Sequence, residues 1–166
     1  MTPTGKYARI ENERRFLLQP MVDEAFPLPG RIILDNYIVD TGLRLRQVEN
    51  EEGTVYKLTK KSVLSPGREG ITTIYLSAEE YKLLAKLRAI VVSKIRFIAI
   101  HNDKIIGIDF YGNEKEDLSI AEVEFETEEQ MKNFVMPISY QMEVTGNAEF
   151  TGFALAHRFG SANRRF

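Results

Sequence analysis

The sequence predicts an α+β protein built mainly on one antiparallel β-sheet. About eight stretches have the side-chain alternation or the β-branched and aromatic composition of strands. Most of these stretches are joined by short polar turns, and only two or three segments have helical spacing. Short connections indicate antiparallel pairing, because parallel strands need a crossover of a dozen or more residues. A twisted sheet of this size tends to curl or to close on itself.

The expected strands follow one another through most of the chain. The first, Arg9–Leu18, alternates between two faces along its whole length. The others are expected at 31–40, 43–49, 54–63, 70–76, 91–100, 104–111 and 118–126. Gly42, the loop 50–53 and the pair Asn102-Asp103 supply turn residues between them. The segment 19–30, with prolines at 20, 27 and 29, is expected to be mainly a connector with room for one helical turn.

The expected helices have recognisable N-terminal signals. Ser77 and Glu80 have the spacing of a capping box and predict a helix over 78–88. The other two helices are expected from a Thr127 cap to about Val135, where Pro137 stops the helix, and from an Asn147 cap to Gly160.

The overall composition limits the classes of function. A chain of 166 residues is most simply one domain, here 1–166 with its core at about 7–160. The net charge of −2, from 22 Lys and Arg against 24 Asp and Glu, gives no reason to expect nucleic acid or a membrane as the main partner. There is no cysteine, no signal-peptide pattern and no stretch approaching the roughly 20 apolar residues of a membrane span. We therefore expect a soluble cytoplasmic protein.

Charged residues recur on alternate positions of nearly every expected strand. Glu11, Glu13 and Arg15 share one face of the first strand. The same alternation relates Arg44 and Arg46, Lys57 and Lys61, Lys94 and Arg96, and Glu122 and Glu124, with Asp109 on a strand between the last two pairs. One interpretation is a half-exposed sheet whose polar face meets water. The other is a closed sheet with these faces inward, where charges are stable only if they pair with one another or bind ions and substrate.

An inward arrangement would suit a specific class of ligand. Clustered guanidinium and ammonium groups match a polyphosphate, whose oxygens arginine can bind in pairs. Carboxylates repel phosphate, but they can hold Mg²⁺ or Mn²⁺, which bridges to it. Bases together with clustered acids therefore indicate metal-assisted phosphate chemistry.

These motifs resemble those of the CYTH domain, the triphosphate tunnel metalloenzymes. Glu11-x-Glu13-x-Arg15 followed by Phe-Leu-Leu is similar to the opening motif of that family. The resemblance continues in order through Asp35-x-Tyr37 with Asp40, Leu43-Arg44-Leu45-Arg46, Leu58-Thr59-Lys60-Lys61, Lys94-Ile95-Arg96-Phe97, Asp109-Phe110, Ile120-Ala121-Glu122-Val123-Glu124-Phe125 and Glu143-Val144-Thr145. It implies a closed eight-stranded antiparallel β-barrel with flanking helices, a charged tunnel, a triphosphate substrate and Mg²⁺ or Mn²⁺.

The resemblance also implies roles for individual residues. Metal binding or water positioning would fall to Glu11, Glu13, Glu122 and Glu124, with Asp109 near the metal end. The triphosphate would be bound by Arg15, Arg44, Arg46, Lys61, Lys94 and Arg96, with Lys57 and Arg68 as additional contacts. The expected catalytic residues are Arg15 and the four glutamates. Two positions depart from the family pattern: Arg15 stands where lysine is usual, and Thr72 or Thr73 stands where a carboxylate is expected.

Three functions are compatible with this reading. The first is metal-dependent hydrolysis of inorganic tripolyphosphate or an organic triphosphate. The second is a class IV-type adenylate cyclase, which makes cyclic AMP from ATP. The third is a non-catalytic module that binds polyphosphate or a nucleotide. The expected partner in each case is a small-molecule triphosphate, and a homodimer is left open.

Overall fold

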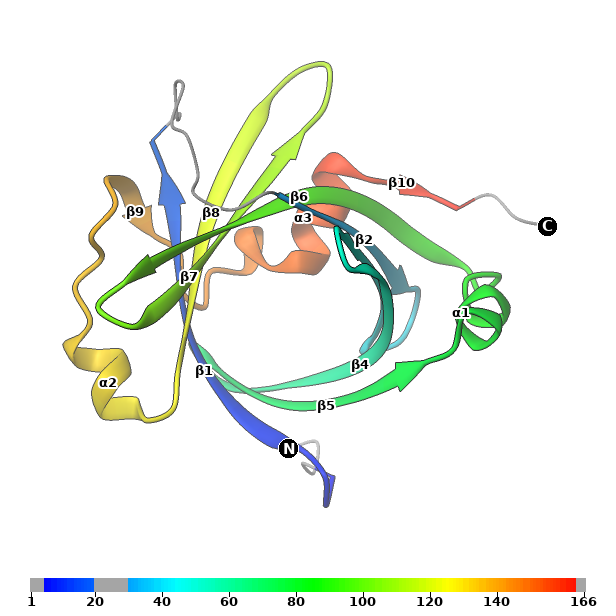
Figure 1. Cartoon of the computed structure of the whole chain (residues 1–166), viewed down its shortest axis with the longest axis horizontal. Coiled ribbons are helices and arrows are strands. Elements are labelled where there is room, and N and C mark those ends of the chain that lie inside the picture. The colour runs from blue at the N-terminus through cyan, green and yellow to red at the C-terminus, as the bar shows by residue number, and fades with distance from the viewer. Residues whose placement is uncertain (1–4, 20–29, 164–166) are drawn as a thin grey trace.

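The computed structural model describes residues 5–19 and 30–163, and these contain an antiparallel barrel with three short α-helices (Figure 1). The barrel strands are β1 (Arg9–Leu18), β2 (Arg31–Ile38), β3 (Leu43–Asn50), β4 (Gly53–Ser65), β5 (Arg68–Leu76), β6 (Ala89–His101), β7 (Lys104–Gly112) and β8 (Asp117–Phe125). The remaining elements are α1 (Ala78–Leu84), α2 (Glu128–Asn133), β9 (Tyr140–Glu143), the 3₁₀ helix η1 (Ala148–Phe150), α3 (Gly152–Phe159) and β10 (Ser161–Ala162).

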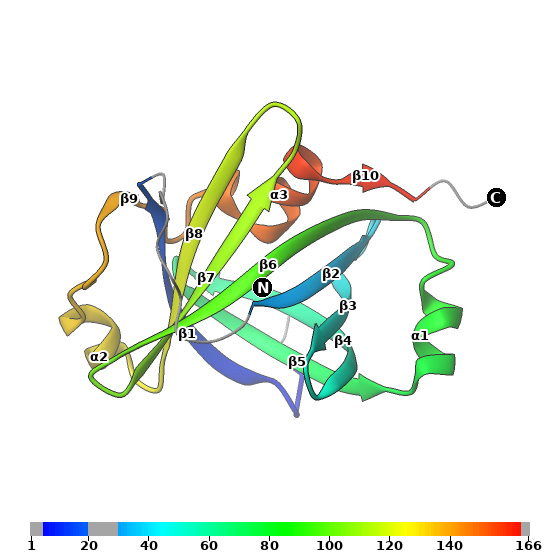
Figure 2. The ribbon, with the colours of Figure 1, turned by 45° about the horizontal axis from the view of Figure 1, so that its top comes forward.

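The eight long strands form a closed ring. Their order is β6-β2-β3-β4-β5-β1-β8-β7, and β7 pairs with β6 to complete the circle. In Figures 1 and 2, β3, β4 and β5 form one curved wall, while β1, β8 and β7 form another. All pairings are antiparallel, so the predicted fold class is confirmed.

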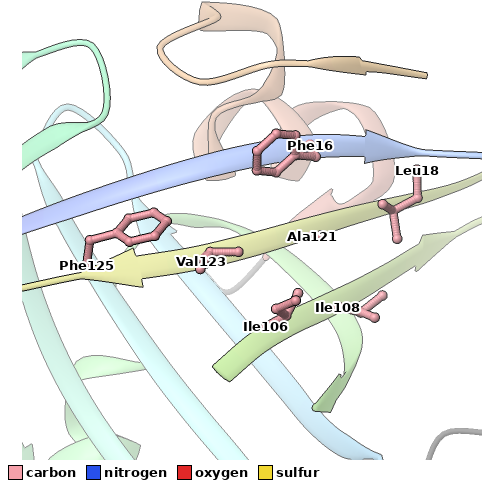
Figure 3. Close-up of a cluster of buried hydrophobic side chains, with 7 residues drawn as sticks. All are labelled: Phe16, Leu18, Ile106, Ile108, Ala121, Val123 and Phe125. Carbon is pink, nitrogen blue, oxygen red and sulfur yellow. The ribbon is translucent and has the colours of Figure 1, made fainter. Parts of the chain in front are cut away.

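The main apolar core lies on the outer side of the barrel wall. It consists of Phe16, Leu18, Ile106, Ile108, Ala121, Val123 and Phe125, which Figure 3 shows on three neighbouring strands. Partly buried residues of α2 and the segment that follows it, including Met131 and Phe134, pack against this cluster. Because side chains alternate along each strand, the opposite faces of β1 and β8 point into the barrel. The core therefore leaves the interior to the charged residues.

A second apolar cluster covers one end of the barrel interior. Leu155 and Ala156 of α3 pack with Val92, Tyr111, Leu118 and Ile120. Val92 shares the face of Lys94, and Ile120 shares the face of Glu122, so this cluster touches the inner side of the wall. Figure 2 shows α3 beside β6, β7 and β8. Thus α3 is a plug over one end of the charged interior.

Gly67 allows the β4–β5 turn to lie against β1. Its φ of +73° is in the left-handed region, and an added Cβ would lie 2.7 Å from the Glu13 carbonyl oxygen. The backbone N–H of Glu13 donates to the Gly67 carbonyl at 2.8 Å. This close approach fixes the part of β1 that carries the acidic residues.

The structure confirms the capping box of Ser77 and Glu80 but shortens the helix that follows it. This helix ends at Leu84, because the chain then turns toward β6 and the Asn163 side chain donates to the carbonyls of Ala85 and Leu87. The second helix has the expected Thr127 cap and ends at Asn133.

The third helix begins later than predicted. Asn147 caps η1, whereas Thr151 accepts from the Ala154 N–H and caps α3. Residues 161–162 form β10 and pair with the edge of β6. Most of the predicted 19–30 connector lies outside the described residues. No helix in the described ranges is long and apolar enough to span a membrane.

Candidate active site

The strand register places most of the predicted charged residues on the inner face of the barrel. Arg15 stands opposite Glu122, and Glu13 stands opposite Glu124. On other paired strands of the barrel, Arg44 stands directly opposite Thr59, Arg46 opposite Lys57, and Arg96 opposite Asp109. Directly opposed residues on antiparallel strands share a face. The side chains of Arg15, Glu122 and Arg96 are largely buried and that of Asp109 is fully buried, so the structure supports the interpretation in which the charges face inward.

Three glutamates form the acidic side of the barrel, with Glu11 and Glu13 half-buried and Glu124 exposed at its edge. In the part of the chain that the structure describes, Glu11, Glu13 and Glu124 each offer a carboxylate oxygen within 4.8 Å of the other two. Burial and the neighbouring carboxylate of Glu122 together raise the pKa of Glu13 to about 8, against the opposing charge of Arg15. Burial and Glu11 likewise raise the pKa of Glu124. Such a group of oxygen donors fits Mg²⁺ or Mn²⁺, whose charge would offset the repulsion between the carboxylates.

Lys61 connects this acidic group to β5. Its Nζ lies 3.2 Å from Glu11 Oε2 and 2.7 Å from Glu69 Oε2. Glu69 was not among the predicted site residues, although it stands directly opposite Glu11 in the register. Thr73 also belongs to the inner face, where its hydroxyl lies 3.0 Å from that of Thr59. A neutral hydroxyl pair thus lies where the family pattern would place a carboxylate.

Glu122 and Asp109 are engaged by bases and do not belong to the three-glutamate group. Arg15 Nη2 lies 2.9 Å from Glu122 Oε1, and Arg96 Nη2 contacts Glu122 Oε2. Burial raises the pKa of Glu122, but Arg96 and Arg15 outweigh this and hold it well below its usual range. Asp109 is fully buried, accepts from Arg96 at 2.5 and 2.6 Å and also contacts Lys94. The structure therefore separates the five predicted metal ligands into two groups.

Arg15 is anchored by the protein on several sides. Its Nη1 donates to the Phe150 carbonyl in η1, and its backbone N–H donates to Thr145 Oγ1 at 3.0 Å. Its Nε lies 3.6 Å from Glu13 Oε1. The guanidinium thus links the acidic residues to the segment that leads into the plug, which a lysine at this position could do with only one nitrogen.

The basic side of the interior is formed by β3, β4 and β6. Asp35 of β2 accepts two hydrogen bonds from Arg46, at 2.6 and 2.7 Å, and lies 3.7 Å from Arg44 Nε. Burial lowers the pKa of Lys94 to about 8, although the carboxylate of Asp109 opposes this. Lys57 Nζ lies over the ring of Tyr75, 5.2 Å from its centroid. The sequence motif Asp35-x-Tyr37 assigns no role to Asp35, and its alternation with Tyr37 is the signal that places both residues on one face of the strand.

Arg68 lies apart from the other predicted phosphate-binding residues. It stands opposite Asn12, on the face of β1 that points away from Glu11 and Glu13. Its Nε donates to Asn12 Oδ1 at 3.2 Å, and its Nη1 lies 2.8 Å from Glu128 Oε1 at the start of α2. The structure therefore gives Arg68 partners on the outer side of the wall.

Comparisons with solved structures identify proteins of the same fold. No family model and no curated protein matches the chain. The inorganic triphosphatase NE1496 is 24% identical, with 88% of this chain and 93% of that chain covered and a TM-score of 0.57. A proposed adenylate cyclase from Bacillus halodurans is 18% identical, with 76% and 86% covered and a TM-score of 0.56. These likenesses show a shared fold, and together with the strand order they confirm the closed antiparallel barrel that the CYTH resemblance implied.

Proposed function

We propose that this protein hydrolyses a triphosphate inside its barrel with the help of Mg²⁺ or Mn²⁺. The observation that carries the proposal is the separation of charge on the inner wall, with Glu11, Glu13 and Glu124 close together and the bases of β3, β4 and β6 around them. An anionic chain of three phosphates needs both parts, because the bases bind its oxygens and the acids hold a bridging cation. The shared fold with an inorganic triphosphatase supports the same conclusion.

The basic residues would bind and orient the substrate. Those on the inner face are Arg44, Arg46, Lys57, Lys61, Lys94 and Arg96. Phosphoryl transfer has a loose transition state with charge spread over the equatorial oxygens, so positioning and fixed positive charge supply most of the catalysis. Several of these bases already have acidic partners, such as Asp109 for Arg96, which fixes their orientation before substrate arrives.

The acidic residues would hold the cation and keep the neighbouring arginines in place. Glu11, Glu13 and Glu124 have the geometry to hold Mg²⁺ or Mn²⁺, which when bound would neutralise phosphate oxygens and acidify a water molecule. Glu122 remains ionised between Arg15 and Arg96 and keeps both guanidinium groups beside the acidic cluster. In hydrolysis a water oxygen forms a bond to the terminal phosphorus as the bridging P–O bond breaks. Tripolyphosphate would then yield pyrophosphate and phosphate.

The test compares a variant of the acidic cluster with a matched surface variant. Glu13→Gln keeps the size of the side chain but removes its charge, and we expect phosphate release to fall at least about 100-fold because the cation is held less well. Glu52→Gln, at an exposed position of the β3–β4 hairpin, should leave the rate unchanged. Undiminished metal-dependent activity in Glu13→Gln would overturn the assignment.

Product analysis separates the alternative functions. Tripolyphosphate and ATP are each incubated with the protein and Mn²⁺, and the products are identified. Cyclic AMP with pyrophosphate would indicate the cyclase reaction, whereas phosphate release indicates hydrolysis. Tight tripolyphosphate binding by calorimetry without any product would indicate a binding module.

A further inference from the structure

Asp35 is a buried acid among bases that the proposed function assigns to phosphate. It lies on the inner face of β2, with Arg46 directly opposite on β3, and only 1% of the residue is exposed. Arg46, Arg44 and Lys94 act together to hold its pKa well below its usual range, against the effect of burial. Asp35 is therefore ionised, and it was not among the predicted site residues.

The contacts of Asp35 fix the orientation of one arginine and restrict a second. Arg46 donates from Nε to Oδ1 at 2.6 Å and from Nη2 to Oδ2 at 2.7 Å, so the two planar groups are held in a common plane. A guanidinium carries five N–H donors, and this fork uses two of them. Arg44 approaches the same carboxylate, with its Nε 3.7 Å from Oδ1. The single negative charge of Asp35 thus faces two positive charges, so these three residues together keep a net positive charge that can attract an anion.

We propose that Asp35 is a positioning residue for triphosphate binding, which holds Arg46 and Arg44 with their remaining N–H groups available to phosphate. The proposal rests on the binding step of the proposed function. A free arginine side chain loses rotamer freedom when it is immobilised, which opposes binding. An arginine that is already held by Asp35 has lost much of that freedom on folding, so binding costs less.

Stability alone explains this carboxylate poorly. A buried ion pair is weak evidence for stability, because desolvation of the charges can exceed their attraction and a well-packed apolar group often replaces them without loss. The same chain also contains a surface pair, Asp40 with Arg88 at 2.9 Å, in which both side chains are largely exposed. That pair provides a matched control, since it is also an Asp–Arg contact and lies just after the same strand.

The primary test measures tripolyphosphate binding by calorimetry in buffer with EDTA, where no metal-dependent hydrolysis occurs. Asp35→Asn keeps the shape of the side chain but removes the charge that fixes the fork. We expect the Kd to rise at least about tenfold, a loss typical of one charge-assisted bidentate contact. Simple electrostatics predicts the opposite, because removing a negative charge should tighten anion binding. An unchanged or lower Kd in Asp35→Asn would therefore overturn the proposal, and Asp40→Asn should match the wild type.

A double-mutant cycle tests whether the effect passes through Arg46. Arg46→Lys keeps the positive charge but cannot form the two-pronged contact. If Asp35 acts by orienting Arg46, the double variant Asp35→Asn/Arg46→Lys should bind about as weakly as Arg46→Lys alone. If the losses in binding free energy of the two single variants add fully in the double variant, Asp35 does not act through Arg46.

Folding and the proposed function are controlled separately. If thermal melts show that Asp35→Asn does not fold, Asp35→Glu, which keeps the charge but displaces the carboxylate, decides the matter, and wild-type affinity in that variant overturns the proposal. Binding that is insensitive to position 35 while wild-type hydrolysis is intact refutes only the role of Asp35. Sensitive binding without any hydrolysis refutes only the proposed reaction.

Discussion

At the scale of single residues, Glu13 shows how the fold raises the pKa of a carboxyl group. Its position between Glu11 and Arg15 on β1 gives it one like and one opposite neighbour along the strand, and β8 adds Glu122 nearby. Burial is the largest influence and favours the neutral acid. The protein without metal therefore keeps a proton on Glu13 at pH values at which an exposed glutamate has lost it.

This raised pKa makes the metal-free protein less stable as pH rises. Folded Glu13 binds a proton with a pKa of about 8, against 4.5 for the free side chain, so its contribution is complete below about pH 4.5 and disappears as pH passes about 8. Between these values the free energy of unfolding should fall by up to about 1.4 kcal/mol per pH unit. Urea unfolding in EDTA at several pH values measures this slope.

Glu13→Gln should reduce this pH dependence and leave the part that Glu124, whose pKa is also raised, contributes with the same sign. Lys94, whose pKa is lowered to about 8, acts above that pH and with the opposite sign, because there the unfolded chain binds the extra proton. Glu122 titrates far below this window. The same slope in Glu13→Gln as in the wild type would show that another group is responsible.

Single residues also show which features of the site can be predicted from the sequence. Alternation correctly placed Glu11 with Glu13, and Glu122 with Glu124, on one face of each strand, because the two-residue period depends only on the strand itself. It could not predict their partners. Whether Asp109 meets a metal or Arg96 depends on the β6–β7 register, which pairs these two residues directly.

At the scale of elements, the long strands were predictable and the short ones were not. The eight barrel strands are long enough to show their period, whereas β9 has four residues, all exposed, and forms by pairing with β1. Arg68 could not be placed for a related reason. A register shift between Val63 and Ser65 and the turn at Gly67 break the alternation, so the face of β5 cannot be counted from β4.

The plug helix α3 should contribute strongly to stability through Leu155. This side chain is fully buried against Val92, Tyr111 and Ile120 at the closed end of the barrel. Leu155→Ala removes three carbons from a packed site and should lower the free energy of unfolding by about 2–4 kcal/mol. Leu83→Ala on α1, where 64% of the residue is exposed, should cost less than about 1 kcal/mol. Urea unfolding of both variants checks the difference, and equal losses would contradict the packing of α3 described above.

At the scale of the whole molecule, the barrel inverts the usual arrangement of a small domain. Apolar residues pack outside the wall on β1, β7 and β8, and charges fill the inside apart from the end that α3 covers. The net charge of −2 does not reveal the charged interior, because acids and bases are nearly equal in number and are separated only in space. The sequence revealed the sorting strand by strand, but only closure of the sheet brings the signs together.

Binding of a divalent cation should stabilise the whole barrel. A ligand that binds only the folded state at 100 times its Kd adds about 2.7 kcal/mol. We expect Mn²⁺ to raise the melting temperature of the wild type at neutral pH, and Glu13→Gln and Glu124→Gln to lose most of that rise. Glu52→Gln should retain it. An equal rise in all four proteins would place the cation elsewhere.

The central claim, a metal-dependent triphosphate hydrolase, is tested most directly by phosphorus NMR of tripolyphosphate incubated with the wild-type protein. With Mg²⁺ or Mn²⁺ present, the substrate signal should give way to pyrophosphate and phosphate in equal amounts, and EDTA should stop the reaction. Persistence of intact tripolyphosphate with either metal, under conditions where calorimetry shows that it binds, would contradict the claim.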